Sequence, residues 1–462
     1  MTLIKSISGI RGTIGGNVGD NLTPIDAVKF AASYGVWLKS YRNKESLTVV
    51  VGRDARLSGH MIQSLVMQTL VGLGIDIIDL DLSTTPTVEV AVPLEHADGG
   101  IILTASHNPK QWNALKLLNE KGEFLNAAEG QKILEIAESD NFQFAEVDDL
   151  GTIKRNDAYI DIHVDEVLNL PLVNVEAIKK AKFRVVVDGV NSTGGIAIPR
   201  LLEELGVETT KLYCDPTGHF PHNPEPLKEH LTDLSEAVKS SACDFGIVVD
   251  PDVDRLAFMD ENGEMFGEEY TLVACADYVL SQTPGNTVSN MSSTRALSDV
   301  TAKHGGQYEA SAVGEVNVVE LMKKNNAIIG GEGNGGIIYP ELHYGRDALV
   351  GVALFLSLLA DKKISVSALR ALYPNYFMSK KKIELTPNLD VDGILKAMES
   401  KYNGERITTI DGVKIDFKES WVHLRKSNTE PIIRIYTEAM TADAANSLAN
   451  KIISEIKAIA SI

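Results

Sequence analysis

The hydrophobic pattern near the start of the chain alternates between short β-branched runs and stretches of helical period. Apolar runs bounded by turn residues are typical of buried strands, whereas apolar positions recurring every three or four residues indicate amphipathic helices. The segments expected in this part are a helix opening at Thr23-Pro24, a strand over 47–52, a helix over 58–74, and strands over 75–82 and 100–104. Short strands joined by helical crossovers predict a parallel α/β layer.

The same pattern returns twice farther along the chain and then changes. The strands and helices expected in the two recurrences are 184–189, 195–205 and 244–250, followed by 268–281, 287–290 and 327–331. After about residue 375, strand patterns lead into one terminal helix, which Thr441 is expected to cap. The segments of this last part are strands over 381–385, 406–410 and 432–436 and a helix over 441–460.

These patterns predict the fold class. We expect an α/β protein with three similar mixed α/β domains plus a C-terminal α+β domain around a central active-site cleft. The 462 residues suffice for several hydrophobic cores, and packed domains without long linkers leave clefts where small ligands bind. The expected domains are 1–155, 156–256, 257–374 and 375–462.

Composition restricts the classes of partner. The chain has 44 Lys and Arg against 63 Asp and Glu, and its formal net charge of −19 disfavours nucleic acid and anionic membrane surfaces. Three cysteines without a CxxC pair fit a reducing compartment better than a disulfide framework. No signal peptide pattern opens the chain, and its most apolar run, 350–360, is shorter than the roughly 20 residues that cross a bilayer. We expect a cytoplasmic protein with a small-molecule partner, either a monomer or a dimer.

The first segment whose side chains could take part in a reaction is Thr104-Ala-Ser-His-Asn-Pro109, directly after an apolar strand. In open α/β sheets, ligands gather at the carboxyl ends of strands, so Ser106 is a candidate nucleophile or phosphoryl carrier, with His107 beside it. Lys116 follows and is suited to neutralising developing charge. On spacing alone, a plain turn that ends the strand explains this segment about equally well.

A second segment carries three carboxylates, Asp250, Asp252 and Asp254, followed by Arg255. Side chains at alternate positions share one face of an extended chain, so the three carboxylates are expected to converge on one cation. Mg²⁺ needs few protein ligands and completes its shell with water or phosphate oxygens. A solvated acidic turn is the weaker alternative, because three carboxylates beside a buried strand repel one another without a cation.

Three further segments carry groups suited to an anionic or hydroxylated ligand. The run 424–431, with Arg434 after it, offers a guanidinium, hydroxyls and loop N–H groups that suit a phosphate. The glycine-rich run 330–336 lets backbone approach a ligand closely. The run 8–12 contains Arg11, which is suited to facing a phosphate.

Taken in order, these segments resemble the α-D-phosphohexomutase superfamily, which includes phosphoglucomutase, phosphomannomutase and phosphoglucosamine mutase. The resemblance covers essentially the whole chain. It rests on Ser8 to Gly12, Gly52-Arg53-Asp54, Thr104 to Pro109 with Lys116, Asp250 to Arg255, Glu332 to Gly335, and Arg425 to Pro431.

The resemblance implies a role for each of these segments. Ser106 would carry a phosphoryl group, and one of its oxygens would join the three aspartates in holding Mg²⁺. The sugar would pass through a glucose- or glucosamine-1,6-bisphosphate. The groups expected to act on the transferred phosphoryl group are Arg11, His107, Lys116 and Arg255. The groups expected to bind substrate are Glu332, Asn334, Gly335, Arg425, Ser427, Asn428, Thr429 and Arg434.

The sequence departs from the family pattern at Gly336, where many relatives have histidine, at Asn334, where many have serine, and at Asn428, where glycine is usual. Because the family histidine is a candidate for proton transfer, the general base stays open here, with His107 and His343 as substitutes.

The resemblance also leaves the substrate open. Glucosamine phosphate is the first choice of sugar, with glucose or mannose phosphate as the alternative. Two further interpretations are weaker. A haloacid-dehalogenase-type enzyme would use Asp250 as nucleophile, which leaves the Ser106 segment unexplained. A sugar-phosphate sensor would not need a phosphoryl donor, metal ligands and phosphate-binding residues (the phosphate grip) together.

Overall fold

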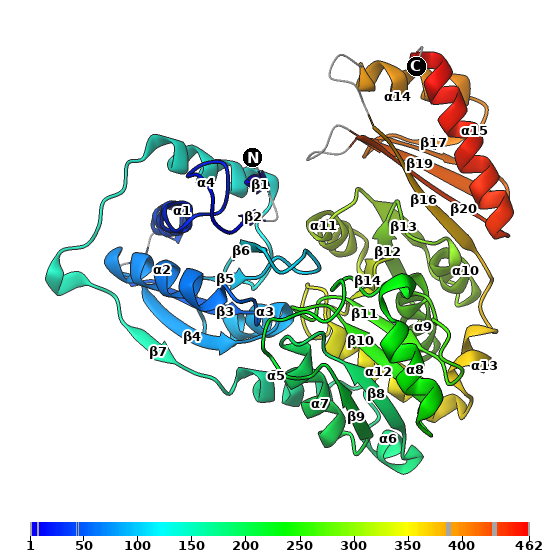
Figure 1. Cartoon of the computed structure of the whole chain (residues 1–462), viewed down its shortest axis with the longest axis horizontal. Helices are drawn as coiled ribbons and strands as arrows, with labels where there is room; N and C mark the ends of the chain where they lie inside the picture. Colours follow the sequence, from blue (N-terminus) through cyan, green and yellow to red (C-terminus); the bar gives the residue numbers. More distant parts are fainter. Residues whose placement is uncertain are drawn as a thin grey trace.

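A computed structural model describes residues 2–6, 9–42, 44, 46–384, 390–426 and 432–460. Within these residues the strands form four sheets, which follow one another along the chain (Figure 1). The first three sheets are mixed and carry helices, and the last is antiparallel. The predicted class, three α/β domains plus a C-terminal α+β domain, is confirmed.

The first sheet has seven strands in the order β1-β2-β6-β5-β3-β4-β7. Its strands are β1 (Ile4–Ser6), β2 (Gly9–Thr13), β3 (Thr48–Arg53), β4 (Asp76–Leu82), β5 (Gly99–Leu103), β6 (Trp112–Leu118) and β7 (Ile153–Arg155). Its helices are α1 (Pro24–Arg42), α2 (Gly59–Gly72), α3 (Thr85–Leu94) and α4 (Ala127–Ser139), with a 3₁₀ turn at Val147–Asp149. One apolar core joins α1, α2 and α4 to the sheet, and a second core joins α3 to the opposite face.

The second sheet has the order β11-β10-β8-β9, in which β8 lies parallel to both β9 and β10 while β11 runs antiparallel. Its strands are β8 (Arg184–Asp188), β9 (Glu208–Leu212), β10 (Phe245–Val249) and β11 (Leu256–Met259). Its helices are α5 (Tyr159–Leu168), α6 (Val175–Ala181), α7 (Gly194–Glu204) and α8 (Thr232–Ser240), with a 3₁₀ turn at Lys228–His230. The predicted boundary at residue 256 falls on the first residue of β11 and stays a prediction.

The third sheet, β13-β12-β14-β15, repeats this plan of three parallel strands and one antiparallel strand. Its strands are β12 (Asn286–Asn290), β13 (Tyr308–Ser311), β14 (Ala327–Glu332) and β15 (Gly336–Ile338). Its helices are α9 (Glu268–Gln282), α10 (Ala296–Lys303), α11 (Glu315–Asn325), α12 (Ala348–Lys362) and α13 (Val366–Arg370). The first sheet contains the same plan in β4-β3-β5-β6, so one architecture occurs three times.

The fourth sheet is antiparallel, in the order β16-β20-β19-β18-β17. Its strands are β16 (Phe377–Glu384), β17 (Arg406–Thr408), β18 (Val413–Asp416), β19 (Ser420–Lys426) and β20 (Ile432–Ala439). Its helices are α14 (Val391–Lys401) and α15 (Ala442–Ala460). The predicted cap is confirmed, since Thr441 Oγ1 accepts a hydrogen bond from the Ala444 N–H at 3.2 Å.

The threefold plan places three loops at corresponding positions. The predicted phosphoryl-carrier segment joins β5 to β6, the aspartate segment joins β10 to β11, and the glycine-rich segment joins β14 to β15. Each loop leaves the carboxyl end of a buried parallel strand, where parallel α/β sheets assemble their sites. In the described part of the chain, no helix is both long and apolar enough to cross a membrane.

Candidate active site

The β5–β6 loop holds Ser106 in an uncommon conformation. Ser106 has a φ of +48°, in the left-handed region that residues other than glycine rarely adopt, and is 8% exposed. The buried Arg56 fastens the loop, because its guanidinium donates to the carbonyl oxygens of Ser106, Asn108, Pro109 and Trp112. Backbone strain held by so many contacts is typical of functional loops.

The β10–β11 connection is a tight turn. The Val253 N–H donates to the Asp250 carbonyl at 3.1 Å, and Val253 has a φ of +65°, unusual for a β-branched residue. The expectation that an extended chain aligns the aspartates is therefore wrong. The turn still brings the three carboxylates together, with Asp250, Asp252 and Asp254 all fully buried.

The two loops meet. The Ser106 hydroxyl donates to Asp250 Oδ2 at 2.6 Å. From β6 of the first domain, Lys116 Nζ lies 2.7 Å from Asp252 Oδ2 and 3.3 Å from Asp254 Oδ2. The predicted carrier, the predicted metal ligands and the predicted cation thus form one cluster between two domains.

The surroundings set different protonation preferences for the aspartates. Burial raises the pKa of Asp250 well above its ordinary value, and the charges of Asp254 and Asp252 raise it further. Burial opposes the charge of Asp252 too, but Lys116 outweighs this effect and lowers the pKa of Asp252. The carboxylates in turn raise the pKa of Lys116, although burial acts against its charge. The charged form of Asp250 is therefore the one that an added cation would stabilise most.

The aspartate cluster fits a hard divalent cation. One oxygen from each of the three carboxylates lies within 4.8 Å of the other two. Asp252 Oδ1 and Asp254 Oδ1 are buried without a hydrogen-bond partner, although buried carboxylate oxygens normally have one. Oxygen ligands of this kind and number suit Mg²⁺.

The third domain contributes Arg346, to which sequence analysis assigned no role. Its guanidinium donates to Asp254 Oδ2 at 2.7 Å, Glu332 Oε2 at 3.0 Å and Glu315 Oε2 at 3.0 Å. It thereby connects the aspartate turn to the glycine-rich hairpin. The sequence shows Arg346 only as a single cation within the run 344–347. Its contacts with residues distant in the chain could not be seen from the sequence.

Two more predicted cations face the same cluster. Arg255 donates to Glu225 Oε1 at 3.2 Å, and its Nε is buried without a hydrogen-bond partner. Burial and the charge of Arg255 lower the pKa of Arg11, while Asp252 and Asp254 raise it, which places Arg11 among these groups. Arg255 Nε lies 3.9 Å from Asp254 Oδ1, which also lacks a hydrogen-bond partner, and a phosphoryl group and its cation would complete both.

His107 and His343, the two candidates for the general base, lie in different places. His107 Nδ1 lies 3.4 Å from Ser106 Oγ, and burial followed by the charge of Arg255 lowers the pKa of His107 well below its ordinary value. His343 instead contacts Asp347 and Glu89. Of the two histidines, His107 is the one beside the predicted carrier.

The β14–β15 hairpin holds Glu332, Asn334 and Gly335. The Asn334 amide donates to Glu332 Oε2 at 3.5 Å, and Gly335 has a φ of +87°. A Cβ on Gly335 would lie 2.1 Å from the Leu256 carbonyl oxygen, and one on Gly336 would lie 2.3 Å from the Arg346 side chain. Arg346 therefore occupies the space that a histidine at position 336 would need, which accounts for glycine there.

The predicted phosphate grip belongs to the fourth domain. Arg425 on β19 donates to Asp411 Oδ1 at 2.9 Å, and Arg434 on β20 is its partner in the strand register. Asp411 also accepts from the Val313 N–H of the third domain at 3.0 Å. The predicted grip residues Ser427, Asn428 and Thr429, like Ser8 of the first motif, lie outside the described residues.

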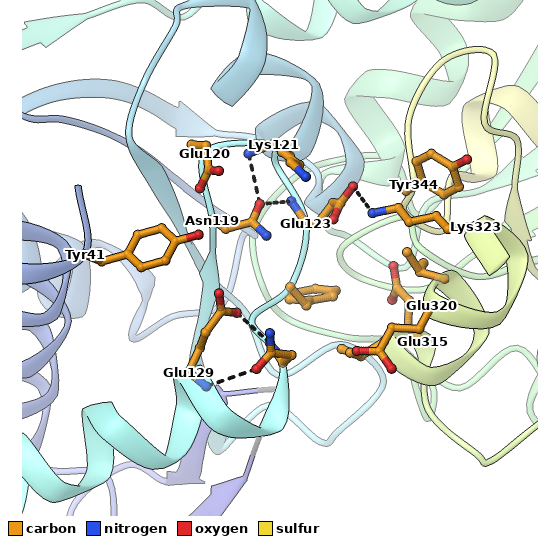
Figure 2. A pocket seen from close by; sticks show the side chains of 14 residues that line it. Tyr41, Asn119, Glu120, Lys121, Glu123, Glu129, Glu315, Glu320, Lys323 and Tyr344 are labelled. Atoms are coloured by element: carbon orange, nitrogen blue, oxygen red, sulfur yellow. Dashed lines mark hydrogen bonds and ion pairs between the residues drawn. The ribbon is translucent and has the colours of Figure 1, made fainter.

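A pocket of about 240 Å³ lies between the first and third domains, next to Glu315 (Figure 2). Its charged lining comprises two lysines and five carboxylates: Lys121, Lys323, Glu120, Glu123, Glu129, Glu315 and Glu320. The Glu123 carboxylate pairs with Lys323 across it. The remaining negative charge disfavours a sugar phosphate in this pocket.

Family models match the chain in the same order as its sheets. They describe phosphoglucomutase/phosphomannomutase alpha/beta/alpha domain I over residues 3–144, domain II over 161–263, domain III over 267–376 and the C-terminal domain over 377–455.

Similar proteins carry names from the same group. The chain is 36% identical to a phosphoglucomutase/phosphomannomutase of Thermococcus kodakarensis, over 94% of this chain and 95% of the relative. It is 32% identical to a phosphoglucosamine/phosphogalactosamine mutase of Sulfurisphaera tokodaii, over 96% and 97%. The crystal structure of a phosphoglucomutase/phosphomannomutase family protein from Burkholderia thailandensis shares 26% identity at a TM-score of 0.83, over 98% of both chains.

The fold, the order of the four matched domains and full-length relatives above 30% identity agree with one another. The chain therefore belongs to the phosphoglucomutase/phosphomannomutase family of phosphohexomutases, which are phosphotransferases of the isomerase class.

Proposed function

We propose that this phosphohexomutase interconverts hexose 6-phosphate and hexose 1-phosphate through a phosphoserine at Ser106 and a 1,6-bisphosphate intermediate. The observation that carries the proposal is the 2.6 Å contact between the Ser106 hydroxyl and Asp250, inside a buried cluster of three carboxylates and several cations. A serine that only ended a strand would not need these surroundings.

In this proposal, phosphorylated Ser106 donates its phosphoryl group to a free sugar hydroxyl, and the other phosphate of the resulting bisphosphate later returns to Ser106. Phosphoryl transfer depends on positioning and on stabilising charge around the moving group. Lys116, Arg11 and Arg255 supply the protein's positive charge. Neutral His107 lies beside Ser106 and is therefore suited to taking the proton of the sugar hydroxyl that accepts the phosphoryl group.

The residues that would hold Mg²⁺ are Asp250, Asp252 and Asp254, together with the oxygen of Ser106. When bound, the ion would neutralise charge on the phosphoryl oxygens. Lys116 and Arg346 meanwhile pair with Asp252 and Asp254 and orient these two carboxylates.

The second phosphate needs a place where it is held without reacting. We assign this role to Arg425, Ser427, Asn428, Thr429 and Arg434 of the fourth domain, because guanidinium and hydroxyl groups bind phosphate through several hydrogen bonds. Glu332, Asn334 and Gly335 would contact the sugar between the two phosphate positions, since carboxylate and amide groups pair with neighbouring hydroxyls. Each end of the sugar would then be held in turn.

For the sugar itself we propose glucosamine phosphate, with glucose or mannose phosphate as the alternative. A relative named as a phosphoglucosamine/phosphogalactosamine mutase supports the first choice, and one named as a phosphoglucomutase/phosphomannomutase supports the second.

The experiment compares kcat/KM for the 6-phosphates of glucosamine, glucose and mannose, with Mg²⁺ and a catalytic amount of the matching 1,6-bisphosphate. We expect the highest value for glucosamine 6-phosphate. A preference for glucose or mannose phosphate would reject the choice of sugar, and no turnover of any of the three would reject the proposed reaction.

A further inference from the structure

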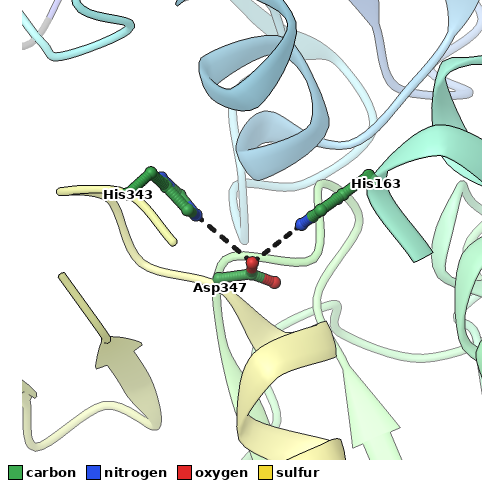
Figure 3. Close-up of side chains that lie close together, drawn as sticks. All are labelled: His163, His343 and Asp347. Carbon is green, nitrogen blue, oxygen red and sulfur yellow. Dashed lines mark hydrogen bonds and ion pairs between the residues drawn. The ribbon is translucent and has the colours of Figure 1, made fainter. Parts of the chain in front are cut away.

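A second buried cluster of ligand-type side chains lies where the first three domains meet, formed by His163, His343 and Asp347 (Figure 3). His163 lies on α5, and Asp347 precedes α12. All three side chains are at most 9% exposed. The proposed reaction, with His107 rather than His343 beside Ser106, uses none of them.

The two Nε2 atoms of this cluster approach one carboxylate oxygen, and all three ligand atoms lie within 4.8 Å of one another. Asp347 Oδ2 lies 2.9 Å from His163 Nε2 and 3.2 Å from His343 Nε2, and the two imidazole planes are nearly perpendicular, at 83°. Ligand atoms around a tetrahedral ion with bonds of about 2.0–2.1 Å are separated by about 3.3 Å. Figure 3 shows the two rings approaching the same carboxylate from opposite sides.

The orientation of Asp347 is set by the helix that it caps. Its Oδ1 accepts hydrogen bonds from the N–H groups of Leu349 and Val350, at 2.8 and 3.3 Å. This leaves Oδ2 directed at the histidines. A carboxylate already held by a helix loses little freedom on binding an ion.

The far side of each imidazole has the kind of partner that metal-bound histidines have. His163 Nδ1 lies 2.9 Å from the Thr87 hydroxyl. His343 Nδ1 lies 3.4 Å from Glu89 Oε2. Histidines that bind a metal through one nitrogen nearly always donate the other N–H to a hydroxyl, carbonyl or carboxylate.

Glu89 is the independent sign that a group is missing. It is 1% exposed, and both of its carboxylate oxygens lack a hydrogen-bond partner among the described residues. The Glu89 carboxylate lies on the Nδ1 side of His343, 3.4 Å away, and a histidine that binds a cation through Nε2 carries its N–H on Nδ1, where it can be donated to Glu89.

Gly345 supports the same arrangement, because a Cβ there would lie 1.9 Å from Glu89 Oε2 and 2.9 Å from His343 Cε1. Glycine is thus the residue that lets these two side chains approach.

We propose that His163, His343 and Asp347 form a structural site for a divalent transition-metal ion, with Zn²⁺ as the preferred ion and Glu89 and Thr87 as outer partners. Two imidazoles and one carboxylate suit Zn²⁺, whereas Mg²⁺ prefers oxygen ligands, so this site and the aspartate cluster select different ions. The ion connects α3, α5 and the start of α12. It also fixes the residue before Asp347, Arg346, which contacts Asp254 and Glu332.

The test uses the full-length wild-type protein, stripped with a chelator and titrated with Zn²⁺ in millimolar Mg²⁺. We expect one Zn²⁺ per chain with submicromolar affinity, a rise in melting temperature, and an X-ray absorption spectrum with two imidazole ligands. The absence of tight Zn²⁺ binding, or a spectrum with oxygen ligands alone, overturns the proposal.

Variants locate the ion. Asp347→Asn keeps the helix cap but loses the anionic ligand, and His343→Gln removes one imidazole. We expect each to weaken Zn²⁺ binding by more than 100-fold, and Glu89→Gln to weaken it by about 10-fold, the scale of an outer partner. The control is His304→Gln, which breaks another histidine–aspartate pair, with Asp277. Equal affinity in His343→Gln and His304→Gln would place the ion elsewhere and overturn the assignment.

Discussion

The first three domains and the fourth domain are joined in different ways. The second and third domains share one apolar core, and the first domain is fastened to them by buried charges, as in the contact between Lys116 and Asp252. The fourth domain has its own core and meets the third through polar contacts, some buried, as between His423 and Ser292, and some that reach the surface. In one of them, between Lys380 and Glu268, the two side chains are 41% and 22% exposed.

This difference indicates that the first three domains and the fourth domain have different roles. Buried charged groups hold the proposed reacting atoms in one geometry, as phosphoryl transfer requires. A domain whose contacts include partly exposed ion pairs can shift at smaller cost, since such pairs contribute little. We therefore expect substitutions among the first three domains to act on kcat and substitutions in the phosphate grip to act on KM.

The largest effect is expected from Ser106→Ala. It removes the proposed phosphoryl carrier and should abolish turnover of sugar phosphates while leaving the fold intact, with a modest fall in melting temperature because the buried Asp250 loses its hydroxyl partner. A coupled mutase assay measures the effect, with Ser64→Ala, at a partly exposed serine on α2, as control. Turnover close to that of the wild type would remove Ser106 from the mechanism.

Next in size is Asp252→Asn. The substitution removes a proposed Mg²⁺ ligand and the partner of Lys116, so we expect kcat to fall by about 100-fold or more, with a modest change in KM. Steady-state kinetics over a range of Mg²⁺ concentrations measure both. Asp161→Asn, at an aspartate whose side chain is 58% exposed, is the control. An unchanged kcat would contradict the role of the aspartate turn.

Arg425→Ala tests the other side of the comparison. Loss of a charged hydrogen bond should weaken sugar-phosphate binding by about 1.5 to 3 kcal/mol and leave kcat much less affected. Arg406→Ala, at an exposed arginine on β17, serves as control. If kcat fell and KM did not, the proposed division between the two regions would be wrong.

The smallest effect, taken per pH unit, concerns the pH dependence of stability at His423, where the fourth domain meets the third. The His423 ring contacts the Ser292 hydroxyl at 2.9 Å, and burial lowers its pKa to about 4. Because the unfolded chain binds the proton more tightly, stability falls as pH drops from about 6.5 toward 4, by up to about 1.4 kcal/mol per pH unit. Melting temperatures of wild type, His423→Gln and the exposed-site control His60→Gln measure this. An equal slope in all three proteins would refute the assignment.

Periodicity predicted part of the strands. The expected strand over 244–250 is observed at Phe245–Val249, and it lies parallel to β8 as crossover topology requires. Strands β1, β7 and β15 were missed, because each has three residues and shows too little of any period. The longer strands β6 and β19 were also missed.

The candidate site could be anticipated in its members but not in its geometry. Ser106, Lys116 and the aspartates were identified by residue type and order, and the structure brings them together. The left-handed backbone at Val253 was not visible, since nothing in a β-branched residue predicts it. Arg346 was assigned no role because its contacts with Asp254 and Glu332 join residues far apart in the chain.

The most direct measurement is the site of phosphoryl labelling. The protein is incubated with glucose 1,6-bisphosphate carrying labelled phosphorus, digested, and analysed by mass spectrometry with and without hydroxylamine. Our account predicts an acid-stable label on Ser106 that hydroxylamine leaves in place. A hydroxylamine-labile label on Asp250, or no label on either residue, would contradict it.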